Sequence, residues 1–305
     1  MQNNEALKFK PVALPCGLKG STRLYTTNLF VGGCPHECRY CYAQGFRAFS
    51  KSGPRPVSLQ SITGVKKFPA RIFLSSASDP LHPIVVELTA KLLQNALQAG
   101  SFVVISTKAL ATPDIVRILS RHSDQVSYTV SLTSLNLERN RILEPYAPSA
   151  YERLHGKKEG QYFLCGIEQL AAGGLHITLK VDTMFPALDD TQENIEGLLR
   201  AARSSGAQAV TMSYAFLRKS FKKRLIGVPL LRDSLIEMNE YQPIASGKGY
   251  SLPLAKKKVR LAKMAKIASD IGCEVISTCR CKNHVEGAFE DIPMSLECHF
   301  HDKWF

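Results

Sequence analysis

The sequence contains no apolar run long enough to cross a membrane, although 45% of its 305 residues are hydrophobic. Its first residues, Met1 to Glu5, also lack the basic-then-apolar pattern of a secretory signal. We therefore expect a cytoplasmic monomer without membrane contact, in which the nine cysteines serve metal or redox chemistry. A chain of this length can bury the core of one sizeable domain.

Acidic residues are in deficit, since 26 Asp and Glu stand against 39 Lys and Arg, for a net charge of +13. Such an excess favours anionic partners through long-range attraction. Nucleic acids, nucleotides and other acidic substrates all fit this charge. It also fits plain solubility, so composition alone does not separate these alternatives.

The cysteines do not follow the paired C-x-x-C units that are typical of structural zinc sites. Instead, Cys34, Cys38 and Cys41 stand at C-x-x-x-C-x-x-C spacing, directly after a predicted strand at 28–32. Three thiolates on a four-iron cluster leave one iron without a protein ligand, where a small molecule can bind. Zinc with His36 as a fourth ligand and a buried apolar cluster are the alternatives. We expect His36 itself to be an exposed loop residue.

Strand patterns alternate with helical patterns along the chain, which predicts a parallel sheet. We expect strands at 28–32, 71–75, 102–106, 126–131, 176–182 and 209–214, and helices at 84–98, 112–121, 162–172 and 191–204. In parallel barrels the chemistry lies at the C-terminal ends of the strands. Polar residues indeed follow five successive predicted strands, at 75–79, 106–108, 131–134, 180–183 and 213–214.

The cysteine loop resembles the cluster-binding loop of the radical S-adenosylmethionine enzymes. This resemblance implies an α/β fold, a partial (β/α)6 barrel of the radical SAM type with a cysteine-containing C-terminal extension. It implies that Cys34, Cys38 and Cys41 hold a 4Fe-4S cluster whose fourth iron chelates S-adenosylmethionine, and that Tyr40 contacts the adenine. The implied chemistry is one-electron cleavage to a 5'-deoxyadenosyl radical, with flavodoxin or ferredoxin as electron donor.

A narrower resemblance, to the spore photoproduct lyase-like family, also labelled DNA repair photolyase, extends from about residue 22 to about residue 220. It rests on Ser75 to Pro80, Leu143 to Pro148 with Arg153-Leu154, Ala171 to Gly174, and Pro186 to Asp190. The cofactor-binding residues that it implies are Ser75, Ser76, Ser78 and Asp79 at the methionine end, Lys108 at the carboxylate, and Ser131 and Ser134 at the ribose.

Ser76 departs from that family, because the true lyases carry a hydrogen-donating cysteine at the matching position. A serine hydroxyl is a far poorer hydrogen-atom donor, so we do not expect thymine-dimer repair by that route. The implied function is hydrogen abstraction from a nucleic-acid base or nucleotide, for modification, rearrangement or repair. A peptide or small anionic metabolite is the alternative substrate, and a methyl- or methylthiotransferase is a competing reaction class. A metal-stabilised nucleic-acid-binding protein without turnover is the alternative outside the enzymes.

We divide the chain into a lead-in over residues 1–24, a barrel core over 25–220 and a C-terminal extension over 221–305. Four residues after the last core strand are expected to bind substrate phosphates, or else to form a solvated basic face: Arg218, Lys219, Lys222 and Lys223. Lys256 to Arg260 open a helix that we expect to end near Ile271 and to present its lysines to solvent. Asp189 and Asp190 are expected to cap the helix that begins near Thr191.

A second group of cysteines lies near the end of the sequence. Cys279 and Cys281 point the same way on an extended chain, and Cys298 can return to the same place. This pattern favours a second iron-sulfur cluster. Zinc with His284 or His299 as the fourth ligand is the next interpretation, and thiols without a metal are the third.

Overall fold

The structure is a computed structural model, and it describes residues 7–11, 24–45, 53–215, 217, 225–243 and 250–276. The α-helices are α1 (Leu59–Thr63), α2 (Val86–Gln98), α3 (Pro113–Ser120), α4 (Leu137–Leu143), α5 (Ala150–His155), α6 (Ile167–Ala172), α7 (Gln192–Ser204), α9 (Arg232–Glu237) and α10 (Leu254–Ile271). The strands are β1 (Lys10–Pro11), β2 (Tyr25–Thr27), β3 (Phe30–Val31), β4 (Arg55–Pro56), β5 (Arg71–Leu74), β6 (Phe102–Thr107), β7 (Val126–Ser131), β8 (Lys157–Glu159), β9 (Tyr162–Leu164), β10 (Ile177–Met184), β11 (Ala209–Tyr214), β12 (Gln242–Pro243), β13 (Tyr250–Ser251) and β14 (Glu274–Val275).

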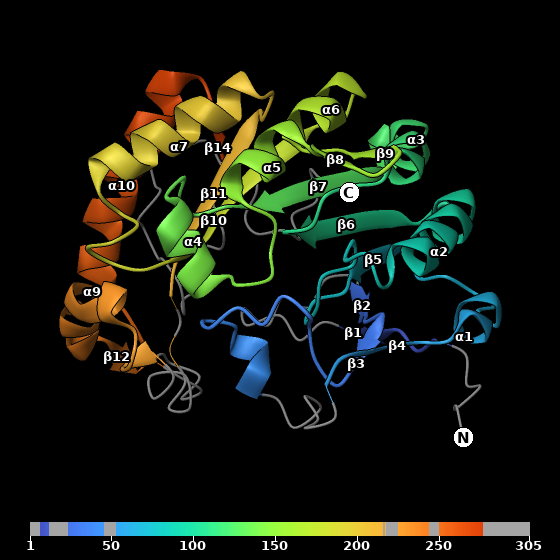
Figure 1. Ribbon diagram of the computed structural model, residues 1–305, viewed down its shortest axis with the longest axis horizontal. Helices are drawn as coiled ribbons and strands as arrows, with labels where there is room; N and C mark the ends of the chain where they lie inside the picture. The colour runs from blue at the N-terminus through green and yellow to red at the C-terminus, as the bar shows by residue number, and fades with distance from the viewer. Residues whose placement is uncertain are drawn as a thin grey trace.

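The centre of the molecule is one eight-stranded sheet, in the order β1-β2-β5-β6-β7-β10-β11-β14. β1 is antiparallel to β2, and the other neighbouring pairs are parallel. The helices follow the outside of the curved sheet in chain order, from α2 and α3 past α6 to α7 and α10 (Figure 1). The predicted α/β class with a parallel sheet is therefore confirmed.

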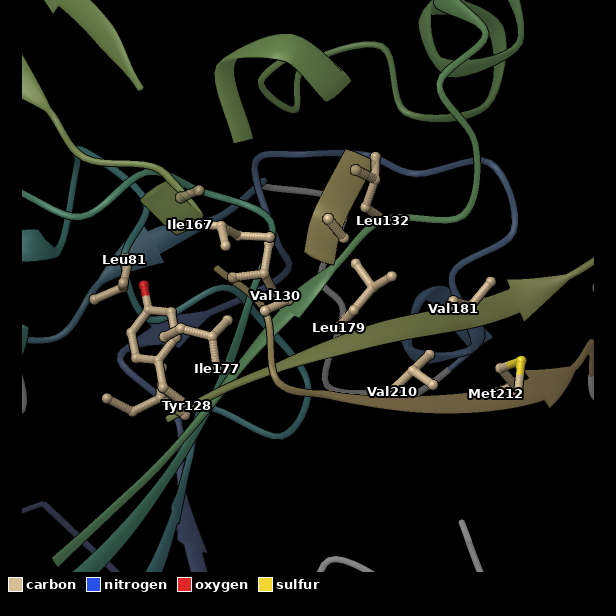
Figure 2. Packing of buried hydrophobic residues seen from close by; sticks show 14 of the residues in the cluster. Leu81, Tyr128, Val130, Leu132, Ile167, Ile177, Leu179, Val181, Val210 and Met212 are labelled. Atoms are coloured by element: carbon tan, nitrogen blue, oxygen red, sulfur yellow. The ribbon is translucent and has the colours of Figure 1, made fainter. Parts of the chain in front are cut away.

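Side chains alternate between two faces along β7, β10 and β11, and this separates the core from the polar face. Val130 pairs with Leu179, and Leu179 pairs with Val210, so these apolar side chains share one face. Figure 2 shows the three in the hydrophobic cluster. One position further along, Ser131 pairs with Lys180 on the opposite face. The register therefore places polar side chains on the face of the sheet opposite these apolar side chains.

Five predicted strands correspond to β5, β6, β7, β10 and β11, whereas the first predicted strand, at 28–32, is only the two-residue β3 and lies outside the central sheet. The strand of the central sheet is Tyr25–Thr27, which lies parallel to β5, whereas Phe30–Val31 pairs with β4 in a separate ribbon. The prediction followed the apolar residues, although aromatic and β-branched residues favour strands even where they are polar. Residues 162–164 are likewise strand β9 rather than the start of a helix.

The start of α7 corrects a second prediction. Thr191 is its N-cap, and the Thr191 hydroxyl accepts a hydrogen bond from the backbone amide of Asn194 at 3.2 Å. Asp189 and Asp190 do not cap this helix. Both carboxylates accept hydrogen bonds from arginine side chains instead, Asp189 from Arg139 and Asp190 from Arg260.

α10 and β14, which the sequence assigns to the C-terminal extension, lie against the core. β14 is the parallel neighbour of β11, and α10 packs on α7, β11 and β14. Among the helices that the structure describes, none is both long and apolar enough to span a bilayer.

Candidate functional site

A cavity of about 370 Å³ opens at the carboxyl ends of the parallel strands. Its lining contains the three cysteines of the loop and polar residues at or just after the carboxyl ends of β5, β6, β7, β10 and β11. The strand-end contributions are residues 75–79, 106–108, 131, 180, 182–183 and 213–214. The prediction that polar strand ends gather in one place is therefore confirmed by their positions.

Two turns shape the cysteine loop and bring its thiols into this cavity. The amide of Glu37 donates to the carbonyl of Cys34 at 3.2 Å, and the amide of Cys41 donates to the carbonyl of Cys38 at 3.0 Å. Burial raises the pKa of the Cys34 thiol to about 12, with a further contribution from Asp79. Burial also raises the pKa of the Cys38 thiol to about 12. Without a metal, these two thiols hold their protons at neutral pH.

Cys34, Cys38 and Cys41 do not form a ready-made site for a single metal ion. Over the described stretches of the chain, no three His, Cys, Asp or Glu side chains gather around one ion. A zinc site completed by His36 is therefore not formed there. In a 4Fe-4S cluster, by contrast, each cysteine binds a different iron, so the thiols must surround a cube rather than converge on a point.

His36 is buried, with 3% of its surface exposed, so the expectation of an exposed loop residue is wrong. Its Nε2 lies 3.0 Å from Oδ2 of Asp79, and its Nδ1 lies 3.1 Å from the carbonyl oxygen of Tyr146. These contacts fix the cysteine loop to the segment after β5. The sequence position inside a polar loop gave no sign of a buried partner.

Asp79 organises the floor of the cavity. Besides His36, its carboxylate accepts hydrogen bonds from the Thr107 hydroxyl and the Lys108 amide, both at 2.6 Å, and from the amide of Leu81 at 3.0 Å. Burial raises its pKa, but His36 and these donors outweigh burial and hold it well below the ordinary value. Asp79 thus ties the cysteine loop to the ends of β5 and β6, and its predicted contact with the cofactor stays a prediction.

A buried ion network behind Tyr40 was not predicted from the sequence. Glu144, 2% exposed, accepts a hydrogen bond from the Tyr40 hydroxyl and forms an ion pair with Arg153. Arg139 lies 4.0 Å from the same carboxylate and binds Asp189 through two hydrogen bonds, of 2.9 and 2.7 Å. These contacts fix the ring of Tyr40 at the edge of the cavity.

Lys108 reaches into the cavity from the end of β6, and its Nζ lies 5.6 Å from the centroid of the Tyr40 ring. Burial lowers its pKa, but Glu144 and Cys38 raise it by more, so this lysine stays charged. Lys180 and Asp182 form an ion pair of 3.1 Å on the same polar face. Charged groups of both signs therefore line the cavity.

The segment after β5 contains a buried hydroxyl, that of Ser78, without a hydrogen-bond partner among the described residues. The Ala77 amide donates to the side chain of Asn28 at 3.1 Å, which holds the segment in place. Ser75 has a φ of +56°, in the left-handed region that non-glycine residues seldom adopt. The three cysteines of the loop, beside the polar ends of the strands, fit an iron-sulfur cluster with a polar ligand bound to it.

Not all of the site residues that were predicted from the sequence line the cavity. Ser131 and Ser76 line the cavity, but Ser134 is not among its lining residues, and the Ser134 hydroxyl accepts a hydrogen bond from the Asn136 amide at 3.1 Å. The predicted substrate-binding residues Arg218, Lys219, Lys222 and Lys223, and the predicted metal ligands Cys279, Cys281 and Cys298, fall outside the described residues.

Lys257 is a further lining residue that the sequence analysis assigned to solvent. It is buried, with 8% exposed, so the expectation of a solvated lysine run at the start of α10 is wrong at this position. Lys256 beside it is exposed, as expected. Lys257 lies four residues before the buried Leu261 and so shares its face of the helix, whereas Lys256 does not. This spacing is the sequence signal that distinguishes the buried lysine from the exposed one.

No protein-family model matches the chain. It is 26% identical over 202 residues to the uncharacterized protein ORF301 of Acidianus two-tailed virus, covering 59% of this chain and 64% of that protein. It is 25% identical over 214 residues to the uncharacterized protein Rv2578c of Mycobacterium tuberculosis, covering 64% of this chain and 60% of that protein. The chain thus spans less than two thirds of these relatives.

The structure is similar to spore photoproduct lyase complexed with dinucleoside spore photoproduct, with a TM-score of 0.60, 17% identity, and coverage of 88% of this chain and 78% of that one. It is also similar to Streptococcus suis SuiB bound to the precursor peptide SuiA, with a TM-score of 0.52, 12% identity, and coverage of 85% and 49%. SuiB bound to S-adenosylmethionine gives a TM-score of 0.51 at 12% identity, with coverage of 86% and 51%. At these identities the comparison shows the fold, and that fold agrees with the sequence resemblance.

Proposed function

We propose, from the radical S-adenosylmethionine fold of this chain, that it is a radical S-adenosylmethionine enzyme acting on a nucleic-acid base or nucleotide. Cys34, Cys38 and Cys41 would hold a 4Fe-4S cluster, which supplies the electron for cleavage of S-adenosylmethionine to methionine and a 5'-deoxyadenosyl radical. The observation that carries the proposal is the single cavity shared by Cys34, Cys38 and Cys41, none of them in a disulfide, and the polar ends of five parallel strands.

The protein's own side chains are suited to hold such a cofactor. The Tyr40 ring is fixed through its hydroxyl to Glu144, so it offers a rigid aromatic surface beside the cysteines. The charged Lys108 can donate up to three hydrogen bonds to a carboxylate. These two roles agree with the roles that the sequence resemblance implies.

The choice of a nucleic-acid substrate rests on two weaker observations. The net charge of +13 favours a polyanionic partner, and the neighbour with a TM-score of 0.60 was solved with a dinucleoside. The peptide complex of SuiB supports a peptide as the second candidate substrate. Either substrate requires cleavage of S-adenosylmethionine. The first experiment therefore tests for this cleavage, before the two substrates are compared.

The test is anaerobic reconstitution of the full chain with iron and sulfide, followed by addition of S-adenosylmethionine and dithionite. We expect iron to bind and 5'-deoxyadenosine to form, as measured by mass spectrometry. A variant with Cys34→Ala, Cys38→Ala and Cys41→Ala should lose this iron and form no product. Cys165→Ala is the matched control, since Cys165 is buried away from the cavity.

Two results would contradict the proposal. An intact cluster with no 5'-deoxyadenosine and no consumption of S-adenosylmethionine would favour a binding protein without turnover. Turnover without 5'-deoxyadenosine would instead point to methyl or methylthio transfer. Iron and zinc analysis of a variant with Cys279→Ala, Cys281→Ala and Cys298→Ala tests the second metal site, which stays a prediction.

A further inference from the structure

α10 carries a lysine on its buried face. The buried positions of this helix are Lys257, Leu261, Met264, Ala265 and Ala268, a spacing that defines one helical face. Lys257 occupies the first position of that face, where an apolar residue would be expected. It lines the same cavity as the three cysteines and is 8% exposed.

Lys257 has no counter-ion among the residues that the structure describes, although its neighbours on α10 do. Lys256 pairs with Glu240, and Arg260 pairs with Asp190 at 2.8 Å. The effect of burial on the pKa of Lys257 agrees with its having no ion-pair partner in the described ranges. Burial lowers its pKa to about 8, and no carboxylate in the described part of the chain opposes that shift.

An unpaired buried charge destabilises a fold unless something supplies the opposite charge. The ammonium offers three donors, and the wall around it contains the buried Ser251. We propose that Lys257 binds an oxyanion of the substrate, a phosphate or a carboxylate group, on the α10 side of the cavity. This inference rests on the proposed function only in taking the ligand of the cavity to be a substrate.

The position of Lys257 favours the substrate over the cofactor as the source of the oxyanion. The predicted cofactor residues follow β5, β6 and β7, and Lys108 already faces the place predicted for the cofactor carboxylate. α10 packs on β11, which is separated from β6 by β7 and β10 in the sheet. Two lysines from different parts of the sheet can therefore hold two different anions.

The test measures the reactivity of single lysines in the anaerobically purified full chain. Limiting acetylation at pH 8, followed by peptide mass spectrometry, gives separate rates for Lys257 and Lys258. Inorganic phosphate at ten times its dissociation constant should slow labelling of Lys257 about tenfold and leave Lys258 unchanged. Thymidine 5'-monophosphate and succinate, added in separate arms, show whether a phosphate ester or a carboxylate protects better.

Addition of S-adenosylmethionine is the decisive measurement, and it should leave the rate of Lys257 acetylation unchanged. Protection by S-adenosylmethionine alone would overturn the proposal and assign Lys257 to the cofactor carboxylate. Protection by none of the four compounds would also overturn it. Because labelling needs no turnover, a failure to form 5'-deoxyadenosine would sink the proposed function without altering this result.

Lys257→Met gives an independent check, because methionine fits the apolar face of α10. The variant should unfold at a higher temperature than the wild type, since a buried unpaired charge is removed. It should also bind the protecting anion about 10- to 100-fold more weakly, which is the effect of losing a hydrogen bond to a charged group. Lys258→Met, one residue further along, should leave anion binding unchanged. Equal anion binding by Lys257→Met and Lys258→Met would contradict the proposal.

Discussion

Glu144 lies in the protein interior with the cations Arg153, Arg139 and Lys108 around it. Its carboxylate also accepts the Tyr40 hydroxyl, so a single side chain connects the ion network to the wall of the cavity. Removing one member of a buried ion group is costly because the remaining charges lose their partner. Glu144 is therefore expected to matter for both stability and the position of Tyr40.

We predict that Glu144→Gln lowers the free energy of unfolding by about 3–5 kcal/mol, because it leaves the buried Arg153 without its counter-ion. Urea denaturation at pH 7 measures this loss. Glu138→Gln is the control, since Glu138 is an exposed carboxylate of the nearby α4, and it should change the stability by less than about 0.5 kcal/mol. Similar midpoints for the two variants would contradict the prediction.

The same variant should flatten the acid limb of the stability profile. Burial raises the pKa of Glu144, but Arg153, Lys108 and Arg139 outweigh burial and bring it to about 2, below the ordinary value of 4.5. A lowered folded-state pKa gives stability that is present above the ordinary value and is lost as the pH falls towards 2. Between pH 5 and 3 the wild type should lose stability more steeply than Glu144→Gln does.

The site could be predicted from the sequence only where its residues are neighbours in the chain. Cys34 to Cys41 and Ser75 to Asp79 are compact motifs, and the pattern of strands indicates which end of the sheet they occupy. Tyr40 and Glu144 are 104 residues apart, and no spacing rule connects them. The contact of His36 with Asp79 was missed for the same reason.

Among the elements, one arginine connects α10 to its neighbours through two ion pairs. Arg260 binds Asp190 at 2.8 Å and Glu237 at 2.7 Å, so it connects α10 to the segment before α7 and to α9. It lies three residues, or about one turn, after Lys257 on the same helix. The two ion pairs therefore help to set where Lys257 stands relative to the cavity.

We predict that Arg260→Met loosens α10 locally, at a cost of about 1 kcal/mol for partly exposed ion pairs. Backbone amides of α10 should exchange hydrogen about fivefold faster, while those of α2 keep their rates. Arg200→Met removes the more exposed ion pair with Glu196 on α7 and should leave the exchange of α10 unchanged. Exchange that rises equally in α2 and α10 would show a global effect and contradict the prediction.

The elements themselves were predicted best where the pattern is local and long. The strands at 126–131 and 209–214 were predicted to the residue, because each is a continuous run of strand formers that is buried almost throughout. The first strand was misplaced because its three residues carry little apolar signal. In the lysine run of α10, composition indicates a solvated face, whereas the phase with Leu261 and Met264 turns Lys257 alone inward.

For the whole molecule, the net charge of +13 makes a prediction about salt. If the four predicted basic residues Arg218, Lys219, Lys222 and Lys223 each neutralise a phosphate, the affinity for a single-stranded oligonucleotide should fall roughly 50-fold between 50 and 200 mM salt. Replacing the four with glutamine should weaken binding and nearly abolish this dependence. Fluorescence anisotropy measures both.

The control for that prediction is Lys66→Gln with Lys67→Gln, an exposed pair just before β5 at the amino end of the sheet. This pair should leave the salt dependence almost unchanged, because it lies far from the strand ends that form the cavity. If the wild type shows no salt-dependent binding, the nucleic-acid substrate is excluded in favour of a peptide or a small metabolite.

The central sheet ends in two very short strands, and this affects how the protein meets copies of itself. An edge strand presents unpaired amides and carbonyls that another chain can use to extend the sheet. Here β1 and β14 each have two residues, and β1 consists of an exposed lysine and an exposed proline. Proline lacks the amide that such an extension requires, and lysine opposes the approach of a second basic chain. The edge strands that the structure describes thus offer little template for intermolecular β-pairing. We therefore expect concentrated protein to resist aggregation through its sheet edges.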